Sequence, residues 1–504
     1  MGFSETSLQN LALGGSILLI YVLGLYVYRA FYDSLSHIPG PKLAAATLWY
    51  EFYYDVIKKG RYAWEIGKMH EKYGPVVRIN PYEIHIHDPE FIDEVYPGSS
   101  VRRTEKYEWA MRMFGVRFTF IATMDHDLHR LKRNNFAHYL SKATLQKLEP
   151  GIQSVIDHMV FKLREIQGTG KVFNLLDLFS CLTADVMGQY AFAQSYGLLD
   201  GPDFSPHWHK TLMEVSMNGH LLKQFGFLMP LMKAMPIWLV ELTSPGTMTL
   251  IRFQRMFRDQ VIETKKNIEE GRKPEGQTNI FYDVLTNPKV RLQERDDDYL
   301  QDEAQTIIGA GTVTTAHILA ILHFYILTDP KVAAKLQAEL GGLMASSPAP
   351  KWSKLEQLSY LSAIITEGLR IGYGVSGRMQ RVFPDTVLRH SGYAIPTMTP
   401  VSMSAILIHD DPAIFPDPRT FKPERFLEQP ELRKYIISFS KGSRQCAGLN
   451  MAYAELYLGL AAVWAPGRFQ WELFETDVSD VETVHDFLNT SPRLDSKGIR
   501  VTVN

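Results

Sequence analysis

The chain carries the decapeptide FSKGSRQCAG at residues 439–448, directly before an apolar stretch with helical periodicity. This decapeptide contains Cys446, one of two cysteines in the chain, between Gly442 and Gly448. Glycines let a backbone approach a bulky ligand and leave amides free to hydrogen-bond sulfur, and a helix N-terminus stabilises negative charge. The pattern therefore suits a metal-bound thiolate, although a lone cysteine is more often a small buried core residue.

Length and composition restrict the class of protein. The 504 residues are 45% hydrophobic, which is enough to bury a large core, and the formal net charge of -2 gives no basic field for nucleic acid. Two cysteines cannot build the framework of a small secreted domain, so both are expected to be free thiols. Cys181 lies in an apolar helical stretch and is predicted to be a core residue.

Residues 8–28 contain no charged side chain and are long enough to cross a hydrocarbon core. No basic region precedes this stretch and no small-residue cleavage pattern follows it, which argues against a cleaved signal peptide. Arg29 and Lys42 follow the stretch, so the positive-inside tendency places the body of the protein in the cytosol. We therefore predict a single membrane span.

Two further stretches are informative. Residues 296–327 form the longest helical pattern, and residues 309–315, GAGTVTT, stand at its centre. Two glycines inside a helix cost about 1 kcal/mol each, which indicates either close helix packing or a ligand against the backbone.

Residues 76–87 predict a small hairpin in which His85 and His87 share one face, and no third metal ligand is expected nearby.

Four ordered motifs together resemble the cytochrome P-450 family. The decapeptide resembles the haem-binding signature Phe-x-x-Gly-x-Arg-x-Cys-x-Gly, matching at Phe439, Gly442, Arg444, Cys446 and Gly448. The resemblance implies that Cys446 is the axial thiolate of haem iron, a ligand that favours O–O cleavage.

The glycine-containing stretch resembles the oxygen-binding groove of this family, with matches at Ala310, Gly311, Thr314 and Thr315. Val313 stands where the family usually has an acid. The resemblance implies that Thr314 hydrogen-bonds the bound oxygen without its usual carboxylate neighbour.

The other two motifs concern charged residues. Ser359 is expected to cap a helix that carries Glu367 and Arg370 three positions apart, which turns the two charges together. The resemblance adds Arg425 to this pair as a buried structural network. It also implies that four residues hold the haem propionates: His129, Arg133, Arg381 and Arg444. His129 stands where tryptophan is common in the family.

The resemblance implies a mainly α fold with small β-sheets, the haem-thiolate fold, with an N-terminal transmembrane helix. Residues 1–36 would form the anchor and its flank, and residues 37–504 the catalytic domain. The expected activity is insertion of one oxygen atom from O2 into an apolar small molecule of terpenoid or polyketide type. Residues 73–81 and the C-terminal segment look similar to fungal secondary-metabolite members of the trichodiene-oxygenase type.

The implied cofactor is haem b, and electrons would come from NADPH through a separate reductase, with cytochrome b5 as a second donor. The reductase is expected to dock near Arg130, Lys132 and Lys441, on the cytosolic side of the endoplasmic reticulum membrane.

Residues 225–238, rich in Met and aromatics, are either core or an adaptable lid over the substrate. Two alternatives remain open: a haem-thiolate isomerase or dehydratase that needs no external electrons, and a non-catalytic haem-binding protein.

Overall fold

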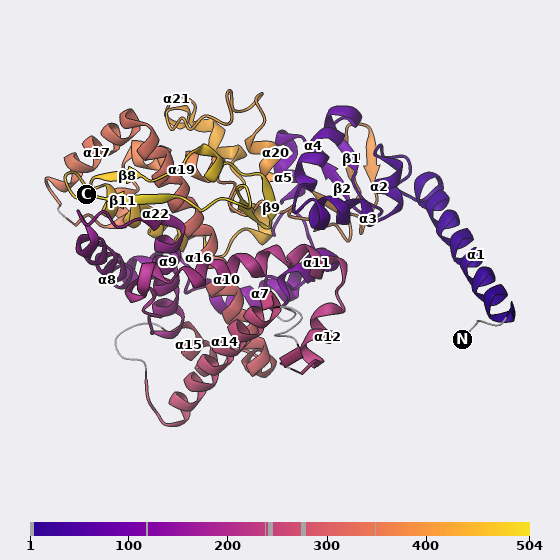
Figure 1. Ribbon diagram of the computed structural model, residues 1–504, viewed down its shortest axis with the longest axis horizontal. Coiled ribbons are helices and arrows are strands. Elements are labelled where there is room, and N and C mark those ends of the chain that lie inside the picture. The colour runs from indigo at the N-terminus through magenta and orange to yellow at the C-terminus, as the bar shows by residue number, and fades with distance from the viewer. Residues whose placement is uncertain (1–4, 117–118, 237, 240–244, 274–278, 348) are drawn as a thin grey trace.

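The computed structural model describes residues 5–116, 119–236, 238–239, 245–273, 279–347 and 349–504. This part of the chain is mainly helical with small sheets, which confirms the predicted fold class (Figure 1). The helices of the first third are α1 (Glu5–Val27), α2 (Lys42–Ala46), α3 (Trp49–Phe52), α4 (Tyr62–Tyr73), α5 (Ile92–Val95), α6 (Glu108–Met111), α7 (His126–Ala137) and α8 (Lys142–Ile166).

The middle of the chain is almost entirely helical. Its helices are α9 (Leu175–Phe192), α10 (Pro206–Met217), α11 (Gly219–Gln224), α12 (Leu228–Ala234), α14 (Pro245–Glu269), α15 (Ile280–Thr286), α16 (Asp297–Thr328), α17 (Pro330–Met344), α18 (Trp352–Leu355) and α19 (Ser359–Ile371). The last third adds α20 (Ala405–His409), α21 (Arg425–Glu428) and α22 (Leu449–Trp464).

The described strands are short and form four separate small sheets. They are β1 (Val76–Arg78), β2 (Ile84–Ile86), β3 (Phe173–Asn174), β4 (Arg381–Val382), β5 (Leu388–His390), β6 (Tyr393–Ile395), β7 (Pro400–Ser402), β8 (Trp471–Leu473), β9 (His485–Phe487), β10 (Asn489–Ser491) and β11 (Arg500–Val503). The largest sheet has the order β1-β2-β7-β4, with β1 and β2 forming the predicted antiparallel hairpin and β2 parallel to β7.

Helix α16 runs through the centre of the body and packs against α9, α14 and α22. Asp296 caps its N-terminus by accepting from the Asp298 amide at 2.9 Å. Gly311 allows α9 to come close, because a Cβ on this residue would lie 2.9 Å from the Met187 sulfur. Gly309 has open space around it. Close helix packing therefore explains one of the two glycines.

Helix α19 begins at Ser359 itself, whereas a capping serine would have to precede the first helical residue. Ser359 is its first residue, and Leu358 is the N-cap without a capping side chain, so the predicted role of Ser359 is wrong. The Glu339 carboxylate of α17 instead accepts from the amides of Tyr360 and Leu361, both at 2.9 Å. An acid from another helix thus satisfies the orphan amides that the local sequence leaves open.

A third histidine does lie beside the hairpin, contrary to expectation. Nε2 of His70, on α4, is 2.7 Å from Nδ1 of His85, and the rings of His70 and His87 are 5.5 Å apart. His70 Nδ1 pairs with the Gly74 carbonyl, so the contact is a hydrogen-bonded histidine pair. Among the described residues no group of His, Cys, Asp and Glu is arranged to hold a metal ion.

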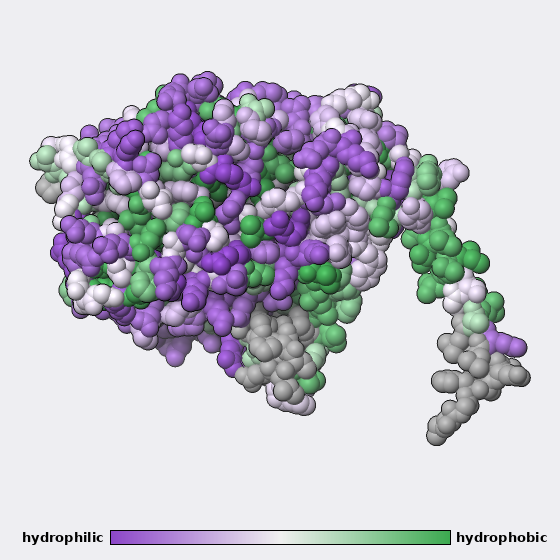
Figure 2. Space-filling view, turned by 45° about the horizontal axis from the view of Figure 1, so that its top comes forward, coloured by the Kyte–Doolittle hydropathy of each residue, from purple (hydrophilic) through white to green (hydrophobic). Residues whose placement is uncertain are grey.

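Helix α1 projects away from the body, and apolar side chains cover much of its surface (Figures 1 and 2). By length and composition two described helices could cross a membrane. The stretch Ala12–Tyr32 is exposed over most of its length, with Ala30 buried near its end, whereas α16 is mostly buried within the protein and is a core helix. The N-terminal stretch is therefore the candidate anchor.

Candidate functional site

A cavity lies between α16 and the decapeptide at residues 439–448. Its wall on the α16 side includes Ala310, Gly311, Thr314 and Thr315. On the other side, the decapeptide contributes Phe439, Ser440, Arg444, Gln445, Cys446, Ala447 and Gly448. The structure thus brings together two motifs that are more than a hundred residues apart in the sequence.

Cys446 lies on the wall of this cavity. The residue is exposed because its surface borders the cavity inside the protein. Its backbone amide donates to the Phe439 carbonyl at 2.9 Å, which closes the loop. Burial raises the pKa of the thiol, while the amides of Gly448 and Leu449 and the Arg133 charge oppose the rise. Amides and a cation directed at sulfur are what a thiolate ligand requires.

The loop needs glycine at one position. Gly442 has φ +71°, and a Cβ on it would lie 2.3 Å from the carbonyl oxygens of both Tyr96 and Pro97. Phe439 lines the cavity, and its ring centre lies 5.4 Å from that of Tyr453 on α22. The decapeptide is therefore held against two other parts of the chain, which fixes the position of Cys446.

Four cationic side chains and one histidine line the cavity: Lys106, Arg133, Arg381, Arg444 and His129. The sequence predicted all of these except Lys106. Arg133 donates to the Gln445 carbonyl at 2.5 Å, and Arg381 donates to Ser440 Oγ at 3.0 Å. Lys106 adjoins the Glu105 bridge to β4, and nothing in its local sequence marks it.

The cations of this cluster oppose one another. Burial, together with repulsion from Arg381, Arg444 and Arg133, lowers the pKa of Lys106 well below its usual range. Burial and the same kind of repulsion lower the pKa of Arg444 to about 9 and strongly lower that of His129. Such a cluster is stable only with anions beside it. The arrangement therefore fits a group that carries carboxylates.

Thr314 lines the cavity opposite the cysteine loop, and its hydroxyl donates to the Ala310 carbonyl at 2.8 Å. Val313 is buried in the hydrophobic core and is not among the residues that line the cavity. Position 313 thus gives the cavity no acid.

The acid that does line the cavity is Glu455, nine residues after Cys446 on α22. Its side chain is buried, and neither carboxyl oxygen has a hydrogen-bond partner of normal geometry among the described residues. Burial raises the pKa of Glu455 well above its usual value, and the neighbouring Thr315 hydroxyl opposes the rise. The sequence analysis missed this residue, although a single acid in the buried part of an apolar helix was a detectable signal.

The predicted charge network behind the site is present. Both oxygens of Glu367 accept from Arg370, at 2.7 and 2.8 Å, and Oε1 also accepts from Arg425 at 3.1 Å. All three side chains are buried, and each arginine also donates to backbone carbonyls. This network carries no group that faces the cavity.

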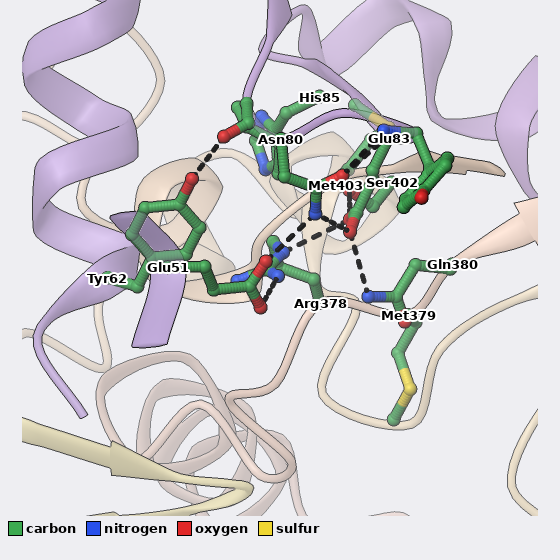
Figure 3. A network of polar contacts seen from close by, with 12 residues as sticks. Glu51, Tyr62, Asn80, Glu83, His85, Arg378, Met379, Gln380, Ser402 and Met403 are labelled. Carbon is green, nitrogen blue, oxygen red and sulfur yellow. Dashed lines mark hydrogen bonds and ion pairs between the residues drawn. The ribbon is translucent and has the colours of Figure 1, made fainter. Parts of the chain in front are cut away.

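A second buried network holds the cavity wall from the side of the large sheet (Figure 3). Arg378 donates to Glu51 at 2.6 Å and to Glu83 at 3.1 Å. Lys223 of α11 donates to the same Glu51 oxygen at 2.6 Å. Burial opposes the ionisation of Glu51, but the two cations hold its pKa well below the usual value. Because Met379 lines the cavity next to Arg378, the network links α11 to the wall.

Comparison with known proteins identifies the class. The family model for cytochrome P-450 matches residues 40–497, so the chain belongs to the cytochrome P-450 family. It is 39% identical to a tryptophan 6-hydroxylase of Fusarium equiseti over 99% of both chains, and 41% identical to a cytochrome P-450 monooxygenase of Ascocoryne sarcoides over 98% of both. An N-acetyltryptophan 6-hydroxylase of Emericella nidulans is 38% identical over 96% of this chain and 95% of that relative.

The chain is thus an oxidoreductase of the monooxygenase class, similar to fungal secondary-metabolite enzymes, with haem iron as cofactor and a redox partner as electron source. The cavity fits the haem group in two respects. It presents a cysteine sulfur near backbone amides, and its cations form no ion pair among the described residues. The described residues therefore agree with the family membership.

Proposed function

We propose that this protein is a membrane-anchored monooxygenase that hydroxylates an apolar small molecule of secondary metabolism. The observation that carries the proposal is the cavity itself, which has Cys446 on one side, Thr314 on the other and a cation cluster at its edge. Bound haem would supply the oxygen chemistry, and the protein would supply ligation, orientation and a dry pocket.

The haem would be held by residues of this chain in three ways. The Cys446 sulfur would ligate the iron, and Phe439 would pack beside the ligand loop. Arg133, Arg381, Arg444 and His129, joined by Lys106, would bind the two propionates, a pairing that relieves the repulsion among these groups. Propionate binding would also leave the apolar part of the cavity free for the substrate.

The substrate would lie against the α16 side of the cavity, where Ala310 and Gly311 leave room and Thr314 offers a hydroxyl. Apolar side chains make up much of the remaining wall: Phe120, Ile121, Ile307, Ile318, Leu369, Val375 and Met379. Such a wall favours a hydrophobic skeleton, of terpenoid, polyketide or aromatic type. The hydroxyls of Thr314 and Thr315 and the protonated carboxyl of Glu455 would be the sources of protons on this side, since Val313 cannot donate one.

We further propose that residues 1–36 anchor the enzyme in the endoplasmic reticulum membrane and that residues 37–504 form the catalytic domain in the cytosol. Exposed apolar side chains of two neighbouring segments would contact the same membrane: Trp49, Tyr53, Ile57, Phe227 and Leu231. The rings of Trp49 and Phe225 lie 6.0 Å apart, which joins these segments. The predicted lid, residues 225–238, includes α12 and falls in this region, although Ile237 lies outside the described residues.

Electrons would come from an NADPH-dependent reductase, with cytochrome b5 as a second donor, docking on the cysteine side near Arg130 and Lys441. Arg130 is exposed, and Lys441 pairs with Asp93 at 3.1 Å. Lys132 is less suited, because its Nζ lies 5.2 Å from the centre of the Tyr299 ring on α16.

The ligand assignment is tested by the reduced protein with carbon monoxide, which is expected to show the red-shifted Soret band of thiolate-ligated haem. Cys446→Ala should lose this band. Cys181→Ala is the matched control and should retain it, because the Cys181 sulfur is buried against the Phe204 carbonyl, 2.9 Å away. Retention of the band in Cys446→Ala would refute the assignment, and turnover without NADPH consumption would favour an isomerase.

A further inference from the structure

The segment of residues 119–125, between α6 and α7, forms part of the cavity wall. Phe120 and Ile121 line the cavity beside Thr306 and Ile307 of α16. The Phe120 ring centre lies 5.9 Å from that of Phe136 and 6.3 Å from that of His129. The segment contains no helix or strand, so its position depends on side chains from elsewhere that bind its backbone.

One end of the segment is held by Arg444, a member of the cation cluster. Its guanidinium donates to the carbonyls of Thr123 at 2.8 Å and Met124 at 2.5 Å. Within the segment, the Ala122 amide donates to the Thr119 hydroxyl at 3.1 Å. The end nearest the cofactor site is therefore tied to a residue that would also bind the haem.

The other end is held by Glu303 of α16. Oε1 of Glu303 accepts from the Phe120 backbone amide at 2.7 Å. Glu303 stands three residues before Thr306 and four before Ile307, so it lies on the same face of the helix as these cavity residues. The hydrogen bond thus fixes the distance between the α16 wall and the Phe120 wall.

Glu303 is fully buried, and its Oε2 has no hydrogen-bond partner of normal geometry among the described residues. None of the ion pairs between described residues includes it. Burial raises the pKa of Glu303 to about 8, while the Tyr299 hydroxyl, the Phe120 amide and the charge of Lys132 oppose the rise. A buried acid without an ion pair costs stability, which favours a role in placing the segment it binds.

We propose that Glu303 is a positioning residue that fixes the Phe120–Ile121 wall and thereby determines which molecules fit beside α16. It touches neither the cofactor site nor the reacting atoms in this arrangement; it acts through the Phe120 amide. The inference rests on the proposed function, since it takes the cavity to be the substrate pocket.

The test compares two ligands of haem iron that differ in reach. Imidazole occupies the iron position only, whereas 1-phenylimidazole extends a ring toward the wall. In Glu303→Met, which removes the acceptor, the Kd of 1-phenylimidazole from optical titration is expected to rise about 5- to 10-fold, the effect of one lost hydrogen bond. The Kd of imidazole should change less than about twofold. Glu303→Gln, which keeps an acceptor oxygen, should leave both nearly unchanged.

A second measurement does not depend on ligand binding. Amide hydrogen exchange of residues 119–125 is expected to be faster in Glu303→Met than in Glu303→Gln, with or without haem. Asp298→Asn is the matched control, because Asp298 is an exposed acid on the same helix. If Glu303→Met does not fold, Glu303→Asp retracts the carboxyl by one methylene and is measured instead.

Equal changes in the Kd of both ligands, no change in either, or unaltered exchange of residues 119–125 would each overturn the positioning role. Failure of the proposed function is a different result: the wild-type protein would then give no spectral change with imidazole at all.

Discussion

Two clusters of buried charge in this molecule differ in how they are paired. In the first, Glu367 binds Arg370 and Arg425, and the remaining donors of the arginines reach backbone carbonyls. In the second, the cations around the cavity repel one another, and the Arg444 Nε atom has no hydrogen-bond partner of normal geometry among the described residues.

The difference indicates what each cluster is for. A charge cluster that is complete within the chain stabilises the fold and needs nothing else. A cation cluster that forms no ion pair among the described residues suits a ligand that brings carboxylates. Pairing within the described residues therefore distinguishes the two clusters, although both contain buried arginines.

The largest effect is expected from breaking the paired cluster. Glu367→Gln leaves Arg370 and Arg425 buried without their anion and should lower the free energy of unfolding by about 3–5 kcal/mol, measured by denaturant titration. Lys335→Met is the control. Lys335 pairs with Glu424 at 2.7 Å on the surface, and its loss should cost less than about 1 kcal/mol. Similar losses in the two variants would show that the buried network is not structural.

Glu303, a buried acid without an ion pair, sharpens the comparison with Glu367. Its pKa is raised from 4.5 to about 8, so between these values the folded state keeps a proton that the unfolded state releases. Stability should therefore fall as pH rises from 4.5 to 8 and level off above that, by at most about 5 kcal/mol overall. The quantity to measure is the unfolding free energy of wild type minus that of Glu303→Gln. A difference that does not depend on pH would contradict the prediction.

Replacing Lys106 should have opposite effects on the stability of the haem-free protein and on the retention of haem. Lys106→Met removes a repelled buried cation, so the haem-free protein should gain about 1 kcal/mol of stability. The same change removes a propionate partner, so haem transfer to an acceptor protein should become faster. Thermal unfolding of the haem-free protein and haem-transfer kinetics measure the two effects. Effects of the same sign on both forms would mean that Lys106 does not serve the cofactor.

Thr314 lies outside both clusters, and its replacement should leave them intact. Thr314→Ala is expected to keep haem content and thermal stability, because the one hydrogen bond that the hydroxyl donates among the described residues is to the Ala310 carbonyl of its own helix. Product formed per NADPH consumed should fall and hydrogen peroxide release should rise several-fold. Equal coupling in wild type and variant would exclude Thr314 from the proton path.

The sequence alone was sufficient for the fold and named many of the residues that line the cavity, because fixed spacings express local geometry. The glycine pattern around Cys446 and the three-residue spacing of Glu367 and Arg370 both follow from the backbone conformation of one segment. The longest helix was predicted within one residue at each end, since capping and periodicity are local as well.

The residues that were missed depend on contacts between distant segments. Lys106 reaches the cavity because residue 105 bridges to Val382, and Glu339 replaces the expected Ser359 cap from a neighbouring helix. His70 meets His85 through the packing of α4 on the hairpin. No local spacing encodes these meetings, so only the folded chain reveals them.

The two cysteines have a practical consequence for spectroscopy. One sulfur is enclosed in α9, and the other would be bound to iron in the loaded enzyme, so thiol reagents would find no reactive native site. A cysteine introduced at the exposed Phe227 would then carry a single spin label without removal of any native thiol. Distances from that label to the paramagnetic iron would report directly whether the segment around Phe227 moves when a substrate binds.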